Sequence, residues 1–314
     1  MRIFTFLMLF GLNSAFAQTS LDTSMAVRIG GIKQWINLSA KDTSKPLLLF
    51  VGGGPGDTYM GTRDYFTTQL QEKFVVVIWD QRESGKTREL NASPQPLTVA
   101  RYQQDTHELI TLLLHRFHRR KLYLVGFSWG TVLGIHMAQQ YPNLLYAYVG
   151  VSQVVHQVES ERLLLQRLKE QATTAKNNTA LKELSLVKIP FGTREHLYYQ
   201  RKWLFAFNDG PRSEAELKKA ILDELPNSLF KLSNEAGKID FTKTVPALQC
   251  PVYFFAGRKD YQTNHHLTYS YYQQLKAKDK HFYWFENSAH VVPFTESDLF
   301  QQTIIGKVLP ETYR

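Results

Sequence analysis

A series of short, continuous apolar runs is the feature that most constrains how this chain can fold. Strands that helices cover on both faces have this pattern, because neither side of such a strand meets water. Helical stretches lie between several of the runs, notably residues 97–117 and 131–140. This alternation predicts an α/β fold with a mostly parallel sheet flanked by helices. The runs are residues 46–51, 74–79, 121–127, 144–151, 251–257 and 281–286.

Two regions depart from the alternation. Residues 25–40 have the pattern of a β-hairpin that turns at Gly30-Gly31. Residues 156–243 have helical patterning and no long apolar strand, which predicts a helical cap inserted into a core made of residues 18–155 and 244–314. The aromatic stretch 197–207 inside this region fits either the cap's own core or the wall of a pocket above an active site.

The first 17 residues have the pattern of a secretory signal peptide. Arg2 precedes an apolar run too short to span a bilayer, and Ala15-Phe16-Ala17 forms an A-x-A cleavage signature. We therefore expect a secreted or periplasmic protein whose mature chain begins near Gln18, with no stable membrane anchor after cleavage.

Cysteine content and charge exclude several classes of site. Cys250 is the only cysteine, so no intrachain disulfide can form, and its place at the head of an apolar run predicts a buried, inert thiol. The net charge of +9 is scattered, and its one basic knot, residues 115–121, ends a helical stretch where cations are favourable. We expect no nucleic-acid partner, no metal site and no cofactor.

The glycine cluster at residues 52–56 could cradle either a phosphate or an oxyanion. The phosphate motif G-x-G-x-x-G does not close, because its third glycine falls on Asp57 or on Tyr59. Residues 85–87 resemble the end of a Walker loop, but Asp80 occupies the place of its first glycine. Neither phosphate motif is present.

The sequence also contains the nucleophile, acid and base that an oxyanion site requires. Gly126 to Gly130 form a G-x-S-x-G motif between a predicted strand and a predicted helix, which would expose Ser128 on a tight turn as a nucleophile. A serine hydroxyl needs a base and an orienting acid, which follow it in the order acid, then histidine, in this architecture. Asp260 and His290 each follow a late apolar run, in that order. The backbone amides of Trp129 and Gly53 are the predicted oxyanion donors.

These motifs resemble those of the proline iminopeptidase group of α/β-hydrolases. The matching segments are GGGPG (52–56), DQRESG (80–85), GFSWG (126–130), GRKD (257–260) and SAH (288–290). The resemblance implies an α/β-hydrolase fold with a cap, Ser128 as nucleophile, Asp260 as acid, His290 as base, and Gly53 and Trp129 as amide donors. Asp80 and Arg82 match a segment that we interpret as mainly structural, holding the loop beside the site.

The chain departs from the family pattern at several positions. Gly52 replaces a histidine, Glu83 replaces a glycine, and Ala289 stands where a glycine usually precedes the histidine. The family reads a substrate's α-amine with cap acids that include a Trp-Glu pair, whereas Leu204 follows Trp203 here. Glu159, Glu161 and Glu195 are cap acids without a clear counterpart in the family.

The sequence therefore predicts an exported serine hydrolase that works through an acyl-enzyme. The resemblance favours cleavage of N-terminal peptide bonds, and small acyl esters are the alternative substrates. A non-catalytic binding protein on a hydrolase scaffold is the alternative from another class, because fold alone does not fix function.

Overall fold

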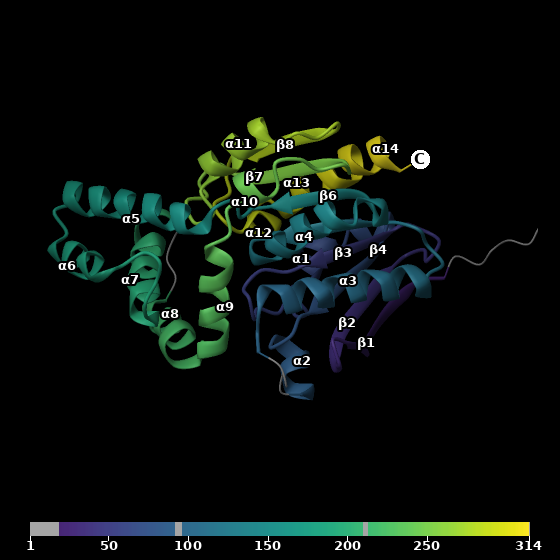
Figure 1. Ribbon diagram of the computed structural model, residues 1–314, viewed down its shortest axis with the longest axis horizontal. Helices are drawn as coiled ribbons and strands as arrows, with labels where there is room; N and C mark the ends of the chain where they lie inside the picture. The colour runs from purple at the N-terminus through teal and green to yellow at the C-terminus, as the bar shows by residue number, and fades with distance from the viewer. Residues whose placement is uncertain (1–18, 92–95, 210–212, 314) are drawn as a thin grey trace, which may run out of the picture.

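One eight-stranded sheet forms the centre of the molecule in the computed structural model, which describes residues 19–91, 96–209 and 213–313 (Figure 1). The predicted leader, residues 1–17, lies outside the described residues. The strand order is β1-β2-β4-β3-β5-β6-β7-β8; β1 and β2 run antiparallel to their neighbours and all other pairs are parallel. The predicted α/β class is confirmed. The strands are β1 (Leu21–Ile29), β2 (Ile32–Ala40), β3 (Leu47–Val51), β4 (Val75–Asp80), β5 (Leu122–Phe127), β6 (Leu145–Val151), β7 (Val252–Gly257) and β8 (Lys280–Phe285).

The antiparallel edge is the predicted hairpin. Strands β1 and β2 pair along their whole length, and Gly30 and Gly31 at the turn have φ values of 57° and 80°. Positive φ at both central residues suits the twist of a two-residue hairpin turn, and glycine adopts it without steric cost. The hairpin begins at Leu21 rather than at Met25.

The apolar runs are buried on both faces because successive side chains point to opposite sides of the sheet. In β3, Leu47, Leu49 and Val51 join one core cluster, and Leu48 and Phe50 join the other. The first cluster packs against α3 (Val99–Arg116), α4 (Trp129–Gln140) and α11 (His265–Gln274). The second packs against α1 (Asp64–Thr67), α12 (Val292–Thr295), α13 (Ser297–Thr303) and the segment leading to α14 (Leu309–Thr312). The short helix α2 (Gly85–Leu90) follows β4.

A group of helices stands beyond one edge of this layered core, between β6 and β7 in the chain (Figure 1). Some of its members share a separate apolar cluster that includes Leu164, Leu184 and Trp203. The last helix of the group instead packs Leu229 and Leu232 into the first core cluster and so joins the cap to the core. The helices are α5 (Gln157–Thr174), α6 (Asn178–Leu186), α7 (Arg194–Leu204), α8 (Glu214–Lys218) and α9 (Asn227–Gly237), followed by α10 (Phe241–Thr244).

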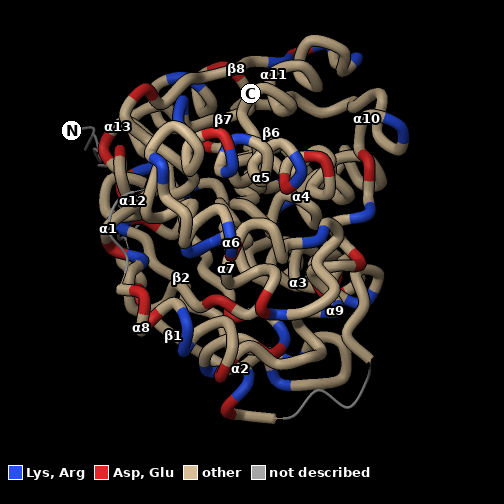
Figure 2. Tube along the Cα trace, turned by 90° about the vertical axis from the view of Figure 1, so that its left-hand side faces the viewer, with Lys and Arg blue, Asp and Glu red and all other residues tan. Residues whose placement is uncertain are grey.

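Charges are dispersed over the molecule. Figure 2 shows Lys and Arg interspersed with Asp and Glu along the trace. Within the ranges that the structure describes, none of the helices has the length and apolar character needed to cross a membrane.

Candidate active site

Ser128 occupies a sharp turn between β5 and α4. Its φ of 52° and ψ of −119° lie where non-glycine residues are rare, as expected of a nucleophile held on a strained strand-to-helix turn. Small neighbours make the turn possible: a Cβ on Gly130 would lie 1.9 Å from the Val51 carbonyl oxygen, and one on Gly126 would lie 2.7 Å from the Gly130 carbonyl oxygen. The motif therefore requires glycine on both sides of Ser128 for steric reasons.

The three predicted triad residues meet at the carboxyl edge of the sheet. Ser128 follows β5, Asp260 follows β7 and His290 follows β8. The Ser128 Oγ lies 2.9 Å from His290 Nε2, and His290 Nδ1 lies 3.0 Å from Asp260 Oδ2. A nucleophile within hydrogen-bond reach of a base, itself held by an acid, is the arrangement that activates a serine.

Asp260 is buried, and its carboxylate is surrounded by donors. Oδ1 accepts from the backbone amides of Gln262 at 2.9 Å and Thr263 at 3.0 Å, and Oδ2 accepts from the Thr263 hydroxyl at 2.6 Å. Burial by itself would raise the pKa of Asp260, but the charge of His290 and the hydrogen bonds from His290 and Thr263 outweigh it and hold that pKa at about 2. The acid therefore stays ionised beside the imidazole.

Ser152 contacts the backbone of His290. This residue was not identified from the sequence. It has a φ of 50°, and its hydroxyl donates to the His290 carbonyl oxygen at 2.7 Å. The Phe127 ring lies 5.6 Å from the His290 ring between centroids. Neither contact has a local sequence signal, because the partners are far apart in the chain.

The glycine loop lies close to Ser128. Gly54 lines the same cavity as Ser128 and Trp129. Gly53 is buried, and an added Cβ there would lie 2.9 Å from Tyr59 Oη. The same Cβ would lie 3.3 Å from the Ser128 Cβ, so Gly53 is close to both the tyrosine and the nucleophile. The Gly53 amide stays the predicted oxyanion donor, and the Gly54 amide is a second candidate because Gly54 lines the cavity.

Tyr59 also explains the missing family histidine. A Cβ on Gly52 would lie 2.5 Å from two carbons of the Tyr59 ring. The tyrosine ring thus fills the space into which a side chain at position 52 would project.

The DQRESG segment makes structural contacts. The Asp80 carboxylate accepts from the Thr58 hydroxyl at 2.6 Å and from the Lys86 amide at 2.8 Å, which ties it to the glycine loop and to α2. Arg82 and Asp105 form a fully buried ion pair at 2.8 Å, and Arg82 also donates to the Gly30 carbonyl oxygen. These bonds anchor the segment between the hairpin and α3.

The cavity above Ser128 has a volume of about 380 Å³, within the usual range of small-molecule sites. Its floor comes from the core and its roof from the cap. Part of the aromatic stretch 197–207 lines it through Leu197 and Phe205, whereas Trp203 and Leu204 belong to the cap's apolar cluster. Both interpretations of that stretch therefore apply, to different side chains. Most of the other roof residues are apolar, among them Val158, Ile189, Phe191, Leu217, Ile221, Leu225 and Phe230.

Of the three cap acids considered from the sequence, Glu161 alone lines this cavity. Its carboxylate pairs with Arg201, which also lines the cavity and donates to Glu161 Oε2 at 2.9 Å. Glu159 is paired with Arg162 outside the cavity, and Glu195 is exposed at the start of α7. Asp57 of the glycine loop is a further cavity-lining carboxylate. The cavity thus offers one acid from the cap and one from the core.

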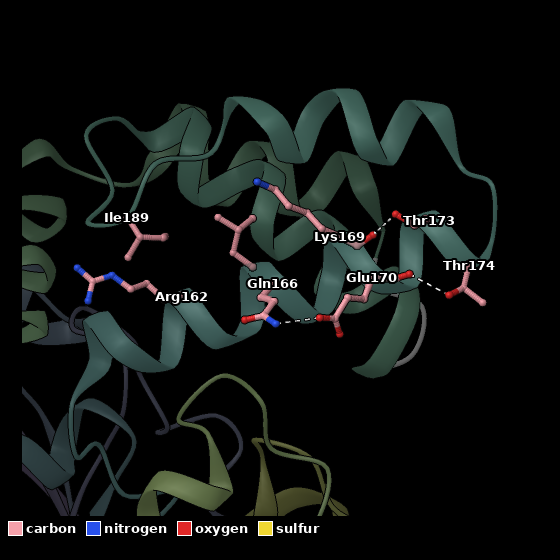
Figure 3. A pocket seen from close by; sticks show the side chains of 8 residues that line it. Arg162, Gln166, Lys169, Glu170, Thr173, Thr174 and Ile189 are labelled. Atoms are coloured by element: carbon pink, nitrogen blue, oxygen red, sulfur yellow. Dashed lines mark hydrogen bonds between the residues drawn. The ribbon is translucent and has the colours of Figure 1, made fainter.

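A second hollow lies along α5 on the cap, away from the triad (Figure 3). Its polar side chains bond within the helix: Gln166 donates to Glu170, and the Thr173 and Thr174 hydroxyls donate to backbone carbonyls one turn earlier. It brings together no nucleophile and base. Cys250, the one residue with a thiol, is buried, and burial raises its pKa to about 12, as expected of an inert thiol.

Comparison with known proteins identifies the family. Residues 43–298 match the family described as serine aminopeptidase, S33. The chain is 31% identical to the probable aminopeptidase YbaC of Bacillus subtilis over 296 residues, which is 88% of this chain and 93% of that protein.

Solved structures share the fold across different activities. The proline iminopeptidase-related protein of Thermus thermophilus superposes with a TM-score of 0.68 at 18% identity, covering 93% of this chain and 98% of its own. An esterase from Exiguobacterium antarcticum superposes with a TM-score of 0.64 at 14% identity, covering 90% and 98%. The resemblance to proline iminopeptidase-like proteins is confirmed: the chain belongs to the serine aminopeptidase S33 family of α/β-hydrolases.

Proposed function

We propose that this protein is a serine hydrolase that works through an acyl-enzyme. The observation that carries the proposal is the hydrogen-bonded chain from Ser128 Oγ through His290 to Asp260. Ser128 lies on the floor of a cavity of about 380 Å³. A buried carboxylate, an imidazole and a hydroxyl in this order form a general base and a nucleophile.

In this mechanism Ser128 Oγ attacks a substrate carbonyl while His290 Nε2 takes its proton. Asp260 holds the imidazole in the tautomer with a proton on Nδ1 and stabilises the imidazolium that forms. The amides of Trp129 and of the glycine loop donate to the oxyanion. The imidazolium then protonates the leaving group, and a water activated by His290 releases the acyl group.

We propose N-terminal peptide bonds, prolyl or with other small residues, as the substrate class. The relationship to the probable aminopeptidase of B. subtilis supports this choice. The mostly apolar roof suits a small apolar side chain, and Glu161 and Asp57 are carboxylates that could receive a free α-amine.

Small acyl esters are the second candidate, and the Glu161–Arg201 pair favours them. The guanidinium neutralises the cap carboxylate, so that carboxylate offers a substrate ammonium less attraction than an unpaired acid would.

A substrate comparison separates the two candidates. Aminoacyl anilides with a free α-amine, the same compounds with the amine acetylated, and short acyl esters would be assayed with the purified protein. A peptidase cleaves the free-amine anilides and loses that activity on acetylation. Fast turnover of the esters alone would establish the esterase instead.

Labelling by a fluorophosphonate tests the hydrolase proposal against a non-catalytic binding protein. We expect labelling of the wild type and none of Ser128→Ala, with turnover in the variant reduced by about 10⁵- to 10⁶-fold. A well-folded wild-type protein that neither labels nor hydrolyses any of these substrates would overturn the proposal.

We also propose that residues 1–17 direct export and are then removed. N-terminal sequencing of protein recovered from the periplasm or medium of an expressing bacterium is expected to begin near Gln18. Full-length protein starting at Met1 and retained in the cytoplasm would contradict this.

A further inference from the structure

Gln81 links the two parts of the oxyanion site, although it is not among the residues that line the cavity. It follows β4 and is 3% exposed. Its Nε2 donates to the Gly52 carbonyl oxygen at 2.9 Å, and its Oε1 accepts from Trp129 Nε1 at 3.0 Å. One buried amide thus joins the glycine loop to the residue that follows the nucleophile. The two partners also fix the orientation of the Gln81 amide. In the flipped form its NH₂ group would face the indole N–H and its oxygen would face the Gly52 carbonyl oxygen, and neither pair can form a hydrogen bond.

The bond to Gly52 acts on a planar peptide. The carbonyl of Gly52 and the amide of Gly53 belong to the same unit, so holding the oxygen on one side directs the N–H to the other. The Tyr59 side chain packs against the same residue, because its hydroxyl would lie 2.9 Å from a Cβ on Gly53. The bond from Gln81 therefore fixes the orientation of the Gly52–Gly53 peptide. The next amide along the chain is that of Gly54, which lines the cavity.

We propose that Gln81 is a positioning residue that sets the glycine-loop and Trp129 amides at the separation an oxyanion requires. This inference rests on the proposed serine hydrolase function and adds to it. Preorganised donors stabilise a developing charge because they need no reorientation during the reaction, and a side chain bonded to both donor segments supplies that preorganisation.

Loss of this positioning should affect the transition state more than substrate binding. The oxyanion forms only after attack by Ser128, whereas the ground-state carbonyl and the rest of the substrate contact the cavity beforehand. A loosened donor pair therefore lowers kcat and leaves KM nearly unchanged.

The test compares two buried glutamines with similar bonds. Gln81→Met removes both hydrogen bonds with little change of volume. Gln34→Met is the control, because Gln34 is also buried, accepts from an indole (Trp79 Nε1, 2.9 Å) and donates to a backbone carbonyl (Ile29, 3.3 Å), but does not line the cavity. Gln34 has one bond more than Gln81, to Asp105 Oδ2 at 2.9 Å, so its loss is the more severe test of stability.

We expect Gln81→Met to lower kcat by about tenfold to a hundredfold, the cost of a small misplacement of catalytic groups, with KM within about twofold of the wild type. Gln34→Met should lose at least as much thermal stability with kcat unchanged. Trp129→Phe, which removes the indole donor alone, should lower kcat less, and should cost little more when added to Gln81→Met.

Several outcomes would overturn the proposal. Equal kcat in Gln81→Met and Gln34→Met would do so, as would a change confined to KM or full additivity of the double variant. If Gln81→Met does not fold, an unchanged kcat in Trp129→Phe decides against it. Failure of the proposed function looks different, since the wild type itself would then show neither turnover nor fluorophosphonate labelling.

Discussion

Asp260 keeps its charge in a buried position because four hydrogen bonds converge on its carboxylate. Two come from backbone amides, one from the Thr263 hydroxyl and one from His290. Since they hold the pKa of Asp260 at about 2, below the 3.8 of an unperturbed aspartate, the charged form stabilises the folded state. That stabilisation is complete above about pH 4, the pKa of the unfolded chain, and is lost as the pH falls through the folded pKa.

Asp260→Asn tests this linkage. The difference in free energy of unfolding between wild type and variant should shrink by about 2 kcal/mol between about pH 5 and pH 2, as the wild-type carboxylate becomes protonated. Urea unfolding of both proteins across that range measures it. The comparison cancels the other titrating groups, so a difference that does not change with pH would refute the proposed electrostatic support of Asp260.

At the scale of elements, the strand-turn-helix around Ser128 depends on close approach of three backbones. Gly130 lies so near the end of β3 that an alanine Cβ would be 1.9 Å from the Val51 carbonyl oxygen. Strand β3 leads directly into the glycine loop, so any displacement there also moves the oxyanion donors.

Gly130→Ala should therefore lower the free energy of unfolding by about 1–3 kcal/mol or more, because backbone atoms cannot yield as a flexible side chain does. It should lower kcat as well. Gly61→Ala is the matched control, since nothing lies within 4 Å of the Cβ it would add. Thermal and urea unfolding distinguish the two variants, and equal stability would contradict the close-approach argument.

The Arg82–Asp105 pair makes a second prediction at this scale, because it joins the segment after β4 to helix α3. Both side chains are fully buried, so Arg82→Ala removes the buried cation beside Asp105 and should cost about 3 kcal/mol of stability. Arg101 at 2.8 Å and Gln34 at 2.9 Å still contact the Asp105 carboxylate and limit the loss. Arg63→Ala breaks the Arg63–Asp22 pair, whose aspartate is 61% exposed, and should cost at most about 1 kcal/mol. Urea unfolding of the two variants checks the contrast. Similar losses would show that burial does not control how much each ion pair contributes to the free energy of unfolding.

At the scale of the whole molecule, the core carries the reacting groups and the cap roofs the cavity above them. The division predicts that cap substitutions change substrate choice while leaving the nucleophile reactive. Glu161 is the cap residue that tests this best, because it lies on α5 and faces the cavity beside Arg201.

For a peptidase, Glu161→Gln should reduce kcat/KM on free-amine substrates by about tenfold or more, since loss of the carboxylate leaves the Arg201 charge facing an ammonium. Acetylated substrates and fluorophosphonate labelling should change little. Glu159→Gln on the same helix is the control, because that residue pairs with Arg162 outside the cavity. An equal effect of Glu161→Gln on free and acetylated substrates would remove Glu161 from amine recognition.

Much of this architecture could be predicted from the sequence, because its signals are local. Runs such as Leu47–Val51 indicate strands buried on both faces, and Gly126 to Gly130 mark the nucleophile turn. The roles of Gln81 and Tyr59 could not be predicted in this way. Gln81 is 29 residues from Gly52 and 48 from Trp129, and no spacing rule joins positions so far apart.

By itself, then, the sequence determined the α/β class, the helical region between the two core segments and the order Ser128, Asp260, His290. Each of these follows from periodicity, small residues or chain order along short segments. Only the tertiary structure showed that Gly54 lines the cavity, and that Glu161 reaches the cavity already paired with Arg201. Both features depend on how amides and side chains from distant elements are oriented, and only the packing of the folded chain determines those orientations.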